Sequence, residues 1–163
     1  MSHPAQKAAQ VPSGNRIITL PAYMMLVLTV FGIAAAVYVA HGNFTGTPLW
    51  CPILDGCNTV VNSPFSRIFG VPMSYFGFIY YVFMFGLSAR LIYEPFSNTL
   101  RFRSVLYSAL GALSSAYFIY LQLGFIRAIC TYCLISAATS FLLLLAALWH
   151  YQVTRKTMTK ITA

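Results

Sequence analysis

Two pairs of cysteines carry the chemistry that this sequence can perform. Cys130 and Cys133 form a CxxC motif at the head of the last apolar segment. Residues three apart share one face of a helix, with Cβ atoms roughly 5 to 6 Å apart, so these thiols can close a disulfide with little backbone movement. In the first turn of a helix, the helix dipole would stabilise the Cys130 thiolate and lower its pKa. The pair is therefore interpreted as redox-active rather than as two buried small hydrophobic residues.

The second pair, Cys51 and Cys57, lies in a predicted loop. Pro52 and Gly56 between them permit a tight closed loop, and a pair on a mobile segment can swing between partners. Two pairs in series make a relay, in which a thiolate attacks a disulfide and electrons pass from one pair to the next.

Electrons from such a relay need an acceptor. The sequence has no haem, flavin or iron–sulfur motif, so a lipid-soluble quinone, ubiquinone or menaquinone, is the simplest terminal acceptor. The competing interpretation is a membrane metal-binding or transport protein in which the four thiolates hold zinc or a soft metal ion.

The composition points to a membrane protein. Of the 163 residues, 59% are hydrophobic and 7% are charged, and the acidic residues are Asp55 and Glu94 alone. Two carboxylates on opposite sides of a membrane cannot form an acid/base pair, and P-loop, GxGxxG and HExxH motifs are absent from the sequence, which excludes hydrolase and kinase classes. Each of four uncharged apolar runs is long enough to span about 30 Å of hydrocarbon as a helix. These runs are residues 17–40, 71–89, 104–126 and 128–149.

The ten basic residues lie at the ends of these runs and not in a patch with interleaved aromatic side chains, so nucleic acid is not an expected partner. Arg67 and Arg127 fall on one side of the predicted membrane and the other eight on the opposite side. This positive-inside bias predicts cytoplasmic termini and places all four cysteines on the outer side. Disulfides persist in the bacterial periplasm or in the secretory lumen, so this orientation suits thiol redox chemistry. Of the two locations, a bacterial inner membrane with periplasmic cysteines is the one expected.

These patterns predict an all-α membrane protein with a bundle of four transmembrane helices in one domain, residues 17–151. A disordered cytoplasmic tail is expected at residues 1–16, and a second cytoplasmic tail at residues 152–163. The last two apolar runs need a turn between them, at residues 124–127, because one helix of that length would be about twice the membrane thickness.

Two further elements would position the cysteines. The turn at residues 124–127 places Cys130 and Cys133 at the start of the fourth helix. In the first outer loop, apolar residues recur about every fourth position from Val61 to Phe69, which predicts a short amphipathic helix lying in the membrane interface.

Aromatic side chains cluster in the outer half of the second span, at Tyr75, Phe76, Tyr80 and Tyr81. A ring stack near a redox pair can hold a flat quinone, although packing alone also explains such a cluster. Gln122 is the one uncharged amide deep in a span and needs a hydrogen-bond partner, on a neighbouring helix or on a ligand carbonyl. Phe76, Tyr80 and Gln122 are therefore candidate quinone-binding residues.

Several motifs occur together in a defined order. They are the loop pair Cys51 and Cys57, Ser63 six residues beyond it, the runs 69–72 and 76–77 at the start of the second span, and the run 130–134 at the start of the fourth. In this combination the chain resembles the bacterial branch of the vitamin K epoxide reductase family, from the first span to the fourth.

The resemblance implies a four-helix bundle around a quinone. Cys133 would lie beside the quinone ring as its reductant, with Cys130 as its disulfide partner. Cys57 would exchange with Cys130, Cys51 would help to receive electrons from a reduced thioredoxin-like protein, and Ser63 would lie near the quinone.

Two positions depart from the family pattern. In the animal enzymes an asparagine before the Phe-Gly pair and a tyrosine four residues after the second CxxC cysteine contact the quinone, whereas this chain has Met73 and Ala137. Ordinary quinone reduction is therefore expected, rather than epoxide reduction.

Many bacterial relatives also carry a fused thioredoxin-like domain. This chain ends about a dozen residues after the fourth span, so a separate thioredoxin-like periplasmic protein is the expected partner. The whole pattern predicts a membrane thiol:quinone oxidoreductase that supports disulfide bond formation, with no metal.

Overall fold

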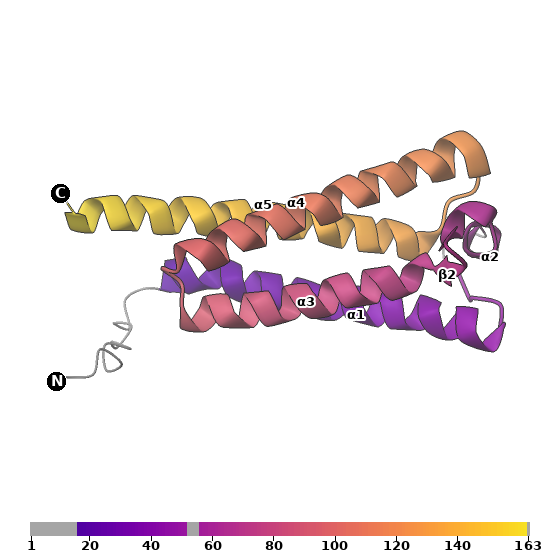
Figure 1. Ribbon diagram of the computed structural model, residues 1–163, viewed down its shortest axis with the longest axis horizontal. Coiled ribbons are helices and arrows are strands. Elements are labelled where there is room, and N and C mark those ends of the chain that lie inside the picture. The colour runs from indigo at the N-terminus through magenta and orange to yellow at the C-terminus, as the bar shows by residue number, and fades with distance from the viewer. Residues whose placement is uncertain (1–15, 52–55, 163) are drawn as a thin grey trace.

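A computed structural model describes residues 16–51 and 56–162 of the chain (Figure 1). The elements, in chain order, are α1 (Arg16–Thr45), α2 (Cys57–Val61), η2 (Pro64–Ser66), β1 (Arg67–Ile68), β2 (Val71–Pro72), α3 (Met73–Tyr93), α4 (Asn98–Leu121), η3 (Gln122–Ile126) and α5 (Thr131–Thr162). In the described residues, α1, α3, α4 with η3, and α5 are each long and apolar enough to cross a membrane. The predicted all-α class with four spans is confirmed.

The helices at the two ends of the chain extend past the limits predicted for the transmembrane domain, residues 17–151. The tail predicted at residues 1–16 lies outside the described residues, except for Arg16, where α1 begins. Residues 152–162, predicted as part of a cytoplasmic tail, continue α5 as a helix, and their side of the membrane stays a prediction. In Figure 1 this part of α5 extends beyond the other helices, at the end of the bundle opposite α2 and β2.

The helices pack through one shared apolar core. α1 contacts α3 and α5, and α4 contacts α5 and α3. Tyr81 of α3 lies at the centre of this core, 1% exposed, and its ring lies so close to Gly32 of α1 that a side chain at Gly32 would overlap it. The Tyr81 hydroxyl contacts the Ser140 hydroxyl at 3.1 Å and donates to the Ser136 carbonyl at 2.7 Å, both on α5. Tyr81 therefore joins three helices.

The segment after Cys57 differs in detail from the predicted interfacial helix. The helix, α2, comes earlier and is short, and Ser63 lies between it and η2. Pro64 has no N–H to continue the helical hydrogen bonds, and Phe69 and Gly70 have positive φ values of 51° and 84°, which reverse the chain between β1 and β2. The apolar spacing after Val61 thus belongs to a turn and a small hairpin.

The predicted turn between the third and fourth spans is present. Residues 122–126 form a π-helix at the end of α4, and Arg127 then adopts a left-handed conformation with φ of 53°. This reversal brings the chain back so that Cys130 directly precedes α5.

Candidate functional site

The two cysteine pairs lie at the same end of the bundle in different oxidation states. Cys51 and Cys57 form a disulfide with Cα atoms 6.4 Å apart, whereas Cys130 and Cys133 are free thiols. Cys57 and Cys130 are each 0% exposed, and Cys51 and Cys133 are partly exposed. Each pair thus has one fully buried cysteine and one partly exposed cysteine.

Those two residues pack into the same small core. Cys57 and Cys130 share a buried cluster with Leu49 and Val60, and Cys51 and Cys133 pack against its edge. Gly56, directly before Cys57, lies against the backbone of Ile129, directly before Cys130. A Cβ atom at Gly56 would lie 2.6 Å from the Ile129 carbonyl oxygen. The absence of a side chain at Gly56 therefore lets the loop approach the start of α5.

Side-chain hydrogen bonds hold the loop in this place. Tyr132, between the CxxC cysteines, donates its hydroxyl to the Trp50 carbonyl at 3.0 Å, and its ring contacts that of Tyr38. Asn58 accepts from the Leu49 N–H at 2.8 Å and donates to the Leu49 carbonyl at 3.2 Å. The residues next to both loop cysteines are thereby fixed relative to α1 and α5.

The environment of Cys130 favours its thiolate. A hydrogen bond from the Cys133 thiol lowers the pKa of Cys130 from its ordinary value of 9.0 to about 7, against the opposing effect of burial, and the N–H groups of Cys133 and Tyr132 add to the lowering. The Cys133 N–H lies 3.4 Å from the Cys130 sulfur. Cys130 is therefore well suited to act as a nucleophile or leaving group near neutral pH.

Gln122 positions the backbone of the CxxC motif. Its side-chain oxygen accepts a hydrogen bond from the Cys130 N–H at 2.9 Å, and the side chain is 3% exposed. The sequence predicted a partner on a neighbouring helix or on a ligand, and the partner is the residue just before α5. The π-helix and the reversal at Arg127 bring the two residues together.

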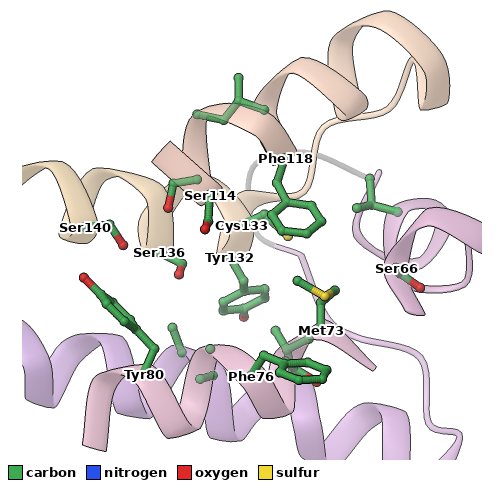
Figure 2. Close-up of a pocket in the computed structure, with 18 of the residues that line it drawn as sticks. Ser66, Met73, Phe76, Tyr80, Ser114, Phe118, Tyr132, Cys133, Ser136 and Ser140 are labelled. Atoms are coloured by element: carbon green, nitrogen blue, oxygen red, sulfur yellow. The ribbon is translucent and has the colours of Figure 1, made fainter. Parts of the chain in front are cut away.

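Beside this end of the bundle lies a cavity of about 440 Å³ (Figure 2). Its walls come from α1, α3, α4, α5 and the segment from α2 to η2, and Cys133 is part of the lining. The predicted quinone-binding residues Ser63, Phe76, Tyr80 and Gln122 all line it. Whether a quinone binds there stays a prediction.

The cavity wall contains polar groups that sequence analysis missed. Ser136 and Ser140 follow Cys133 along one face of α5, and Figure 2 shows Ser114 of α4 near them. The spacing of three and then four residues after Cys133 places these side chains on the same helix face, which is the signal that could have found them. Tyr80 reaches toward these serines from α3 in Figure 2, and its buried hydroxyl has no hydrogen-bond partner within the described part of the chain.

The two departures from the family pattern fall in different places. Met73 lines the cavity, whereas Ala137 is buried, 4% exposed, and is absent from the lining. Within the described residues, no group of three or more His, Cys, Asp or Glu side chains is arranged to hold a metal ion.

Comparison with known proteins agrees with this geometry. Residues 23–148 match the vitamin K epoxide reductase family. The chain belongs to that family. The matched region contains both cysteine pairs and every residue of the cavity wall. The family assignment thus covers the whole candidate site.

A curated relative is the thiol-disulfide oxidoreductase LTO1 of Arabidopsis thaliana. It is 37% identical over 111 residues, which cover 64% of this chain and 30% of the relative. The vitamin K epoxide reductase domain described here therefore spans less than a third of that plant protein.

Proposed function

We propose that this protein is a membrane thiol:quinone oxidoreductase. It passes electrons from a thioredoxin-like partner through Cys51 and Cys57 to Cys130 and Cys133, and then to a quinone. The observation that carries the proposal is the order of the four cysteines, from the partly exposed Cys51, through the buried Cys57 and Cys130, to Cys133 in the cavity wall. The family membership and the name of the Arabidopsis relative support the same class of reaction.

The first step is reduction of the loop disulfide. A thiolate of the reduced partner attacks the Cys51 sulfur, which forms a mixed disulfide and releases the Cys57 thiolate. The second thiol of the partner then resolves that bond, so that the partner leaves oxidised and the loop pair holds two thiols. Attack at Cys51 is favoured because Cys51 is partly exposed and Cys57 is buried.

The second step moves the electron pair inward. The Cys57 thiolate attacks Cys130 of an oxidised inner pair, and Cys133 leaves as a thiolate. Cys51 then attacks Cys57 and releases Cys130, whose pKa of about 7 makes it a good leaving group. The products are an oxidised loop pair and a reduced inner pair.

The last step re-oxidises the inner pair. When Cys130 and Cys133 form a disulfide they release two electrons and two protons, and a quinone bound in the cavity would accept them. The cavity suits a flat apolar ring, because Phe76, Tyr80 and Phe118 are among the side chains that line it. The unpartnered Tyr80 hydroxyl can donate to a carbonyl oxygen of the ring. With Met73 and Ala137 at the two divergent positions, quinone reduction is proposed rather than epoxide reduction.

The location follows from charge and redox chemistry. The positive-inside bias supports cytoplasmic termini and cysteines on the opposite side, which we infer to be the periplasmic side of a bacterial inner membrane. A separate thioredoxin-like periplasmic protein would then be the electron donor, and its oxidised form would introduce disulfide bonds into other proteins.

The proposal is tested by anaerobic quinone reduction with the purified protein and dithiothreitol as electron donor. Wild-type protein is expected to reduce a ubiquinone or menaquinone analogue, and Cys133→Ala is expected to lose this turnover. The double variant Cys51→Ala with Cys57→Ala is the matched control, because a small dithiol can reach the inner pair directly and no loop thiol remains to trap Cys130. Absence of turnover in wild type with both quinones would contradict the proposal, and so would equal turnover in wild type and Cys133→Ala.

A further inference from the structure

A second polar cluster lies at the end of the bundle opposite the cysteines. Arg101 belongs to the first turns of α4, and His150 and Thr154 belong to the part of α5 beside it. Figure 1 shows the start of α4 at the far end from α2 and β2. Arg101 is 4% exposed, and His150 and Thr154 are 0% exposed. The proposed redox reaction uses none of these residues.

The Arg101 guanidinium is only partly satisfied. It donates to the Thr154 hydroxyl at 2.8 Å and to the Asn98 side-chain oxygen at 3.1 Å, and it lies over the Tyr151 ring, 5.5 Å from the centroid. These partners are uncharged. The buried Nε–H group has no acceptor within the described part of the chain.

His150 belongs to the turn of α5 that contacts Arg101, and within the described residues both of its ring nitrogens are unsatisfied. Thr154 accepts from Arg101 and donates to the backbone carbonyl of His150 at 2.6 Å, so Arg101 contacts the turn of α5 that carries His150. Within the described residues, neither ring nitrogen of His150 has a hydrogen-bond partner, although the side chain is fully buried. A neutral imidazole needs one acceptor and one donor, and burial without them costs free energy.

Among the described residues, no carboxylate is suited to balance this charge. The chain has two acidic residues: Asp55, which lies between Cys51 and Cys57 in the sequence, and Glu94, which is exposed at the end of α3. The positive pole of α4 adds to the local positive potential, and the preceding residue, Ser97, makes no side-chain hydrogen bond to the first-turn N–H groups. A buried cation normally has an anionic partner, because burial of an isolated charge is costly.

We propose that an anionic phosphate group binds between Arg101 and His150 at this end of the bundle. Phosphate oxygens are acceptors for the Arg101 Nε–H and for an N–H of His150, and one negative charge balances the guanidinium. Two sources share this chemistry, the phosphodiester of an anionic phospholipid headgroup and soluble inorganic phosphate. The site lies where membrane-spanning helices end, which is where headgroups occur.

The test is ligand-dependent stability of the purified full-length protein in detergent. Phosphatidylglycerol, phosphatidylcholine and inorganic phosphate are added separately, and thermal unfolding and native mass spectrometry report binding. At about a hundredfold excess over Kd, the bound anion is expected to raise Tm by roughly 5 to 10 °C. A rise with phosphatidylglycerol alone assigns the site to a lipid headgroup, and a rise with inorganic phosphate assigns it to soluble phosphate. A rise with none of the three probes overturns the proposal.

Matched variants distinguish binding at this buried cluster from non-specific attraction to surface charge. Arg101→Gln is expected to weaken binding roughly tenfold or more, because a charge-assisted hydrogen bond is lost. Arg103→Gln removes the same charge from an exposed side chain two positions away and is expected to bind as wild type does. Equal weakening in both variants would overturn the proposal.

A second variant keeps the test decisive if Arg101→Gln does not fold. His150→Phe replaces the imidazole with an aromatic ring that has no nitrogens. It therefore removes the free-energy cost of burying two unpaired nitrogens, and it also removes one phosphate contact. Binding weakened relative to wild type supports the site, and unchanged binding in His150→Phe overturns it.

Discussion

Cys130 combines two properties that usually oppose each other, complete burial and a lowered pKa. Burial alone raises the pKa of a thiol, because the thiolate loses its hydration. Here the hydrogen bond from the Cys133 thiol outweighs that effect and brings the pKa of Cys130 to about 7. The same contact places the two sulfurs side by side, so one interaction serves both the acidity of Cys130 and the geometry of disulfide formation.

The titration of Cys130 is therefore expected to depend on its neighbour. In reduced protein carrying Cys51→Ser and Cys57→Ser, thiolate absorbance should rise with a midpoint near pH 7. Adding Cys133→Ala should move the midpoint upward toward the ordinary value of 9.0, because a thiol without its donor ionises only at higher pH. Cys133→Ser retains a donor and should keep most of the lowering. A midpoint unaffected by Cys133→Ala would show that the helix terminus, and not Cys133, sets the acidity.

The adjacent residues Tyr80 and Tyr81 should respond oppositely to loss of the hydroxyl. The Tyr80 hydroxyl is buried in the cavity wall and has no hydrogen-bond partner among the described residues, whereas that of Tyr81 bonds Ser136 and Ser140 on α5. Tyr80→Phe is expected to raise Tm slightly, because it removes a buried hydroxyl without a partner, and to raise KM for quinone roughly 2- to 10-fold, from loss of one hydrogen bond. Tyr81→Phe should destabilise the fold by about 1 to 3 kcal/mol. Thermal unfolding and quinone kinetics on both variants check this; a Tyr80→Phe protein with unchanged KM would remove Tyr80 from the quinone site.

At the scale of elements, the approach of the loop to α5 depends on a residue without a side chain. The backbones of Gly56 and Ile129 touch, and this contact brings Cys57 into the same buried cluster as Cys130. Neither backbone can move far, because Tyr132 holds the loop at Trp50 and Gln122 holds the start of α5 at Cys130. The distance between the two redox pairs is thus set by backbone packing.

Gly56→Ala should separate the two pairs without damaging either one. Turnover driven by a thioredoxin-like donor is expected to fall at least roughly tenfold, because a displacement of about 1 Å can cost a hundredfold in rate. Turnover driven by dithiothreitol should persist, since the inner pair and the cavity are unchanged. Gly86→Ala in α3 is the control, because its added Cβ meets no atom within 4 Å. Equal loss with both donors would mean that Gly56 supports the fold and not the contact between the pairs.

Length and hydropathy predicted the elements that cross the membrane, because a spanning helix needs a long apolar run and little else. The structure of the loop segment after Cys57 was harder to predict. The spacing of Val61, Phe65 and Phe69 suggested one helix, but Pro64 and the left-handed turn at Phe69 and Gly70 divide it into η2 and a hairpin. A period of four apolar residues is weak evidence over so short a stretch, and the backbone preferences of single residues decide the outcome.

At the scale of the whole molecule, the site could be predicted only where its residues carry a motif. The cysteine spacing and the family resemblance located both pairs. The partner of Gln122, the contact of Gly56 with Ile129, and the serines of the cavity wall each depend on the distance between elements far apart in the sequence. Those distances result from helix packing and from the π-helix at the end of α4, which the local sequence did not reveal.

The complete relay makes one prediction that involves the loop, the start of α5 and the redox partner together. In a Cys51→Ala variant, the Cys57 thiolate can attack an oxidised inner pair, but no second loop thiol remains to resolve the product. A disulfide between Cys57 and Cys130 should therefore accumulate, because these residues share the buried cluster while Cys133 faces the cavity. Mass spectrometry of peptides from the non-reduced protein, after oxidation by quinone, would identify the linked cysteines. In Cys51→Ala with Cys130→Ala the linkage should disappear, whereas a stable link between Cys57 and Cys133 would mean that electrons enter the inner pair at the other cysteine.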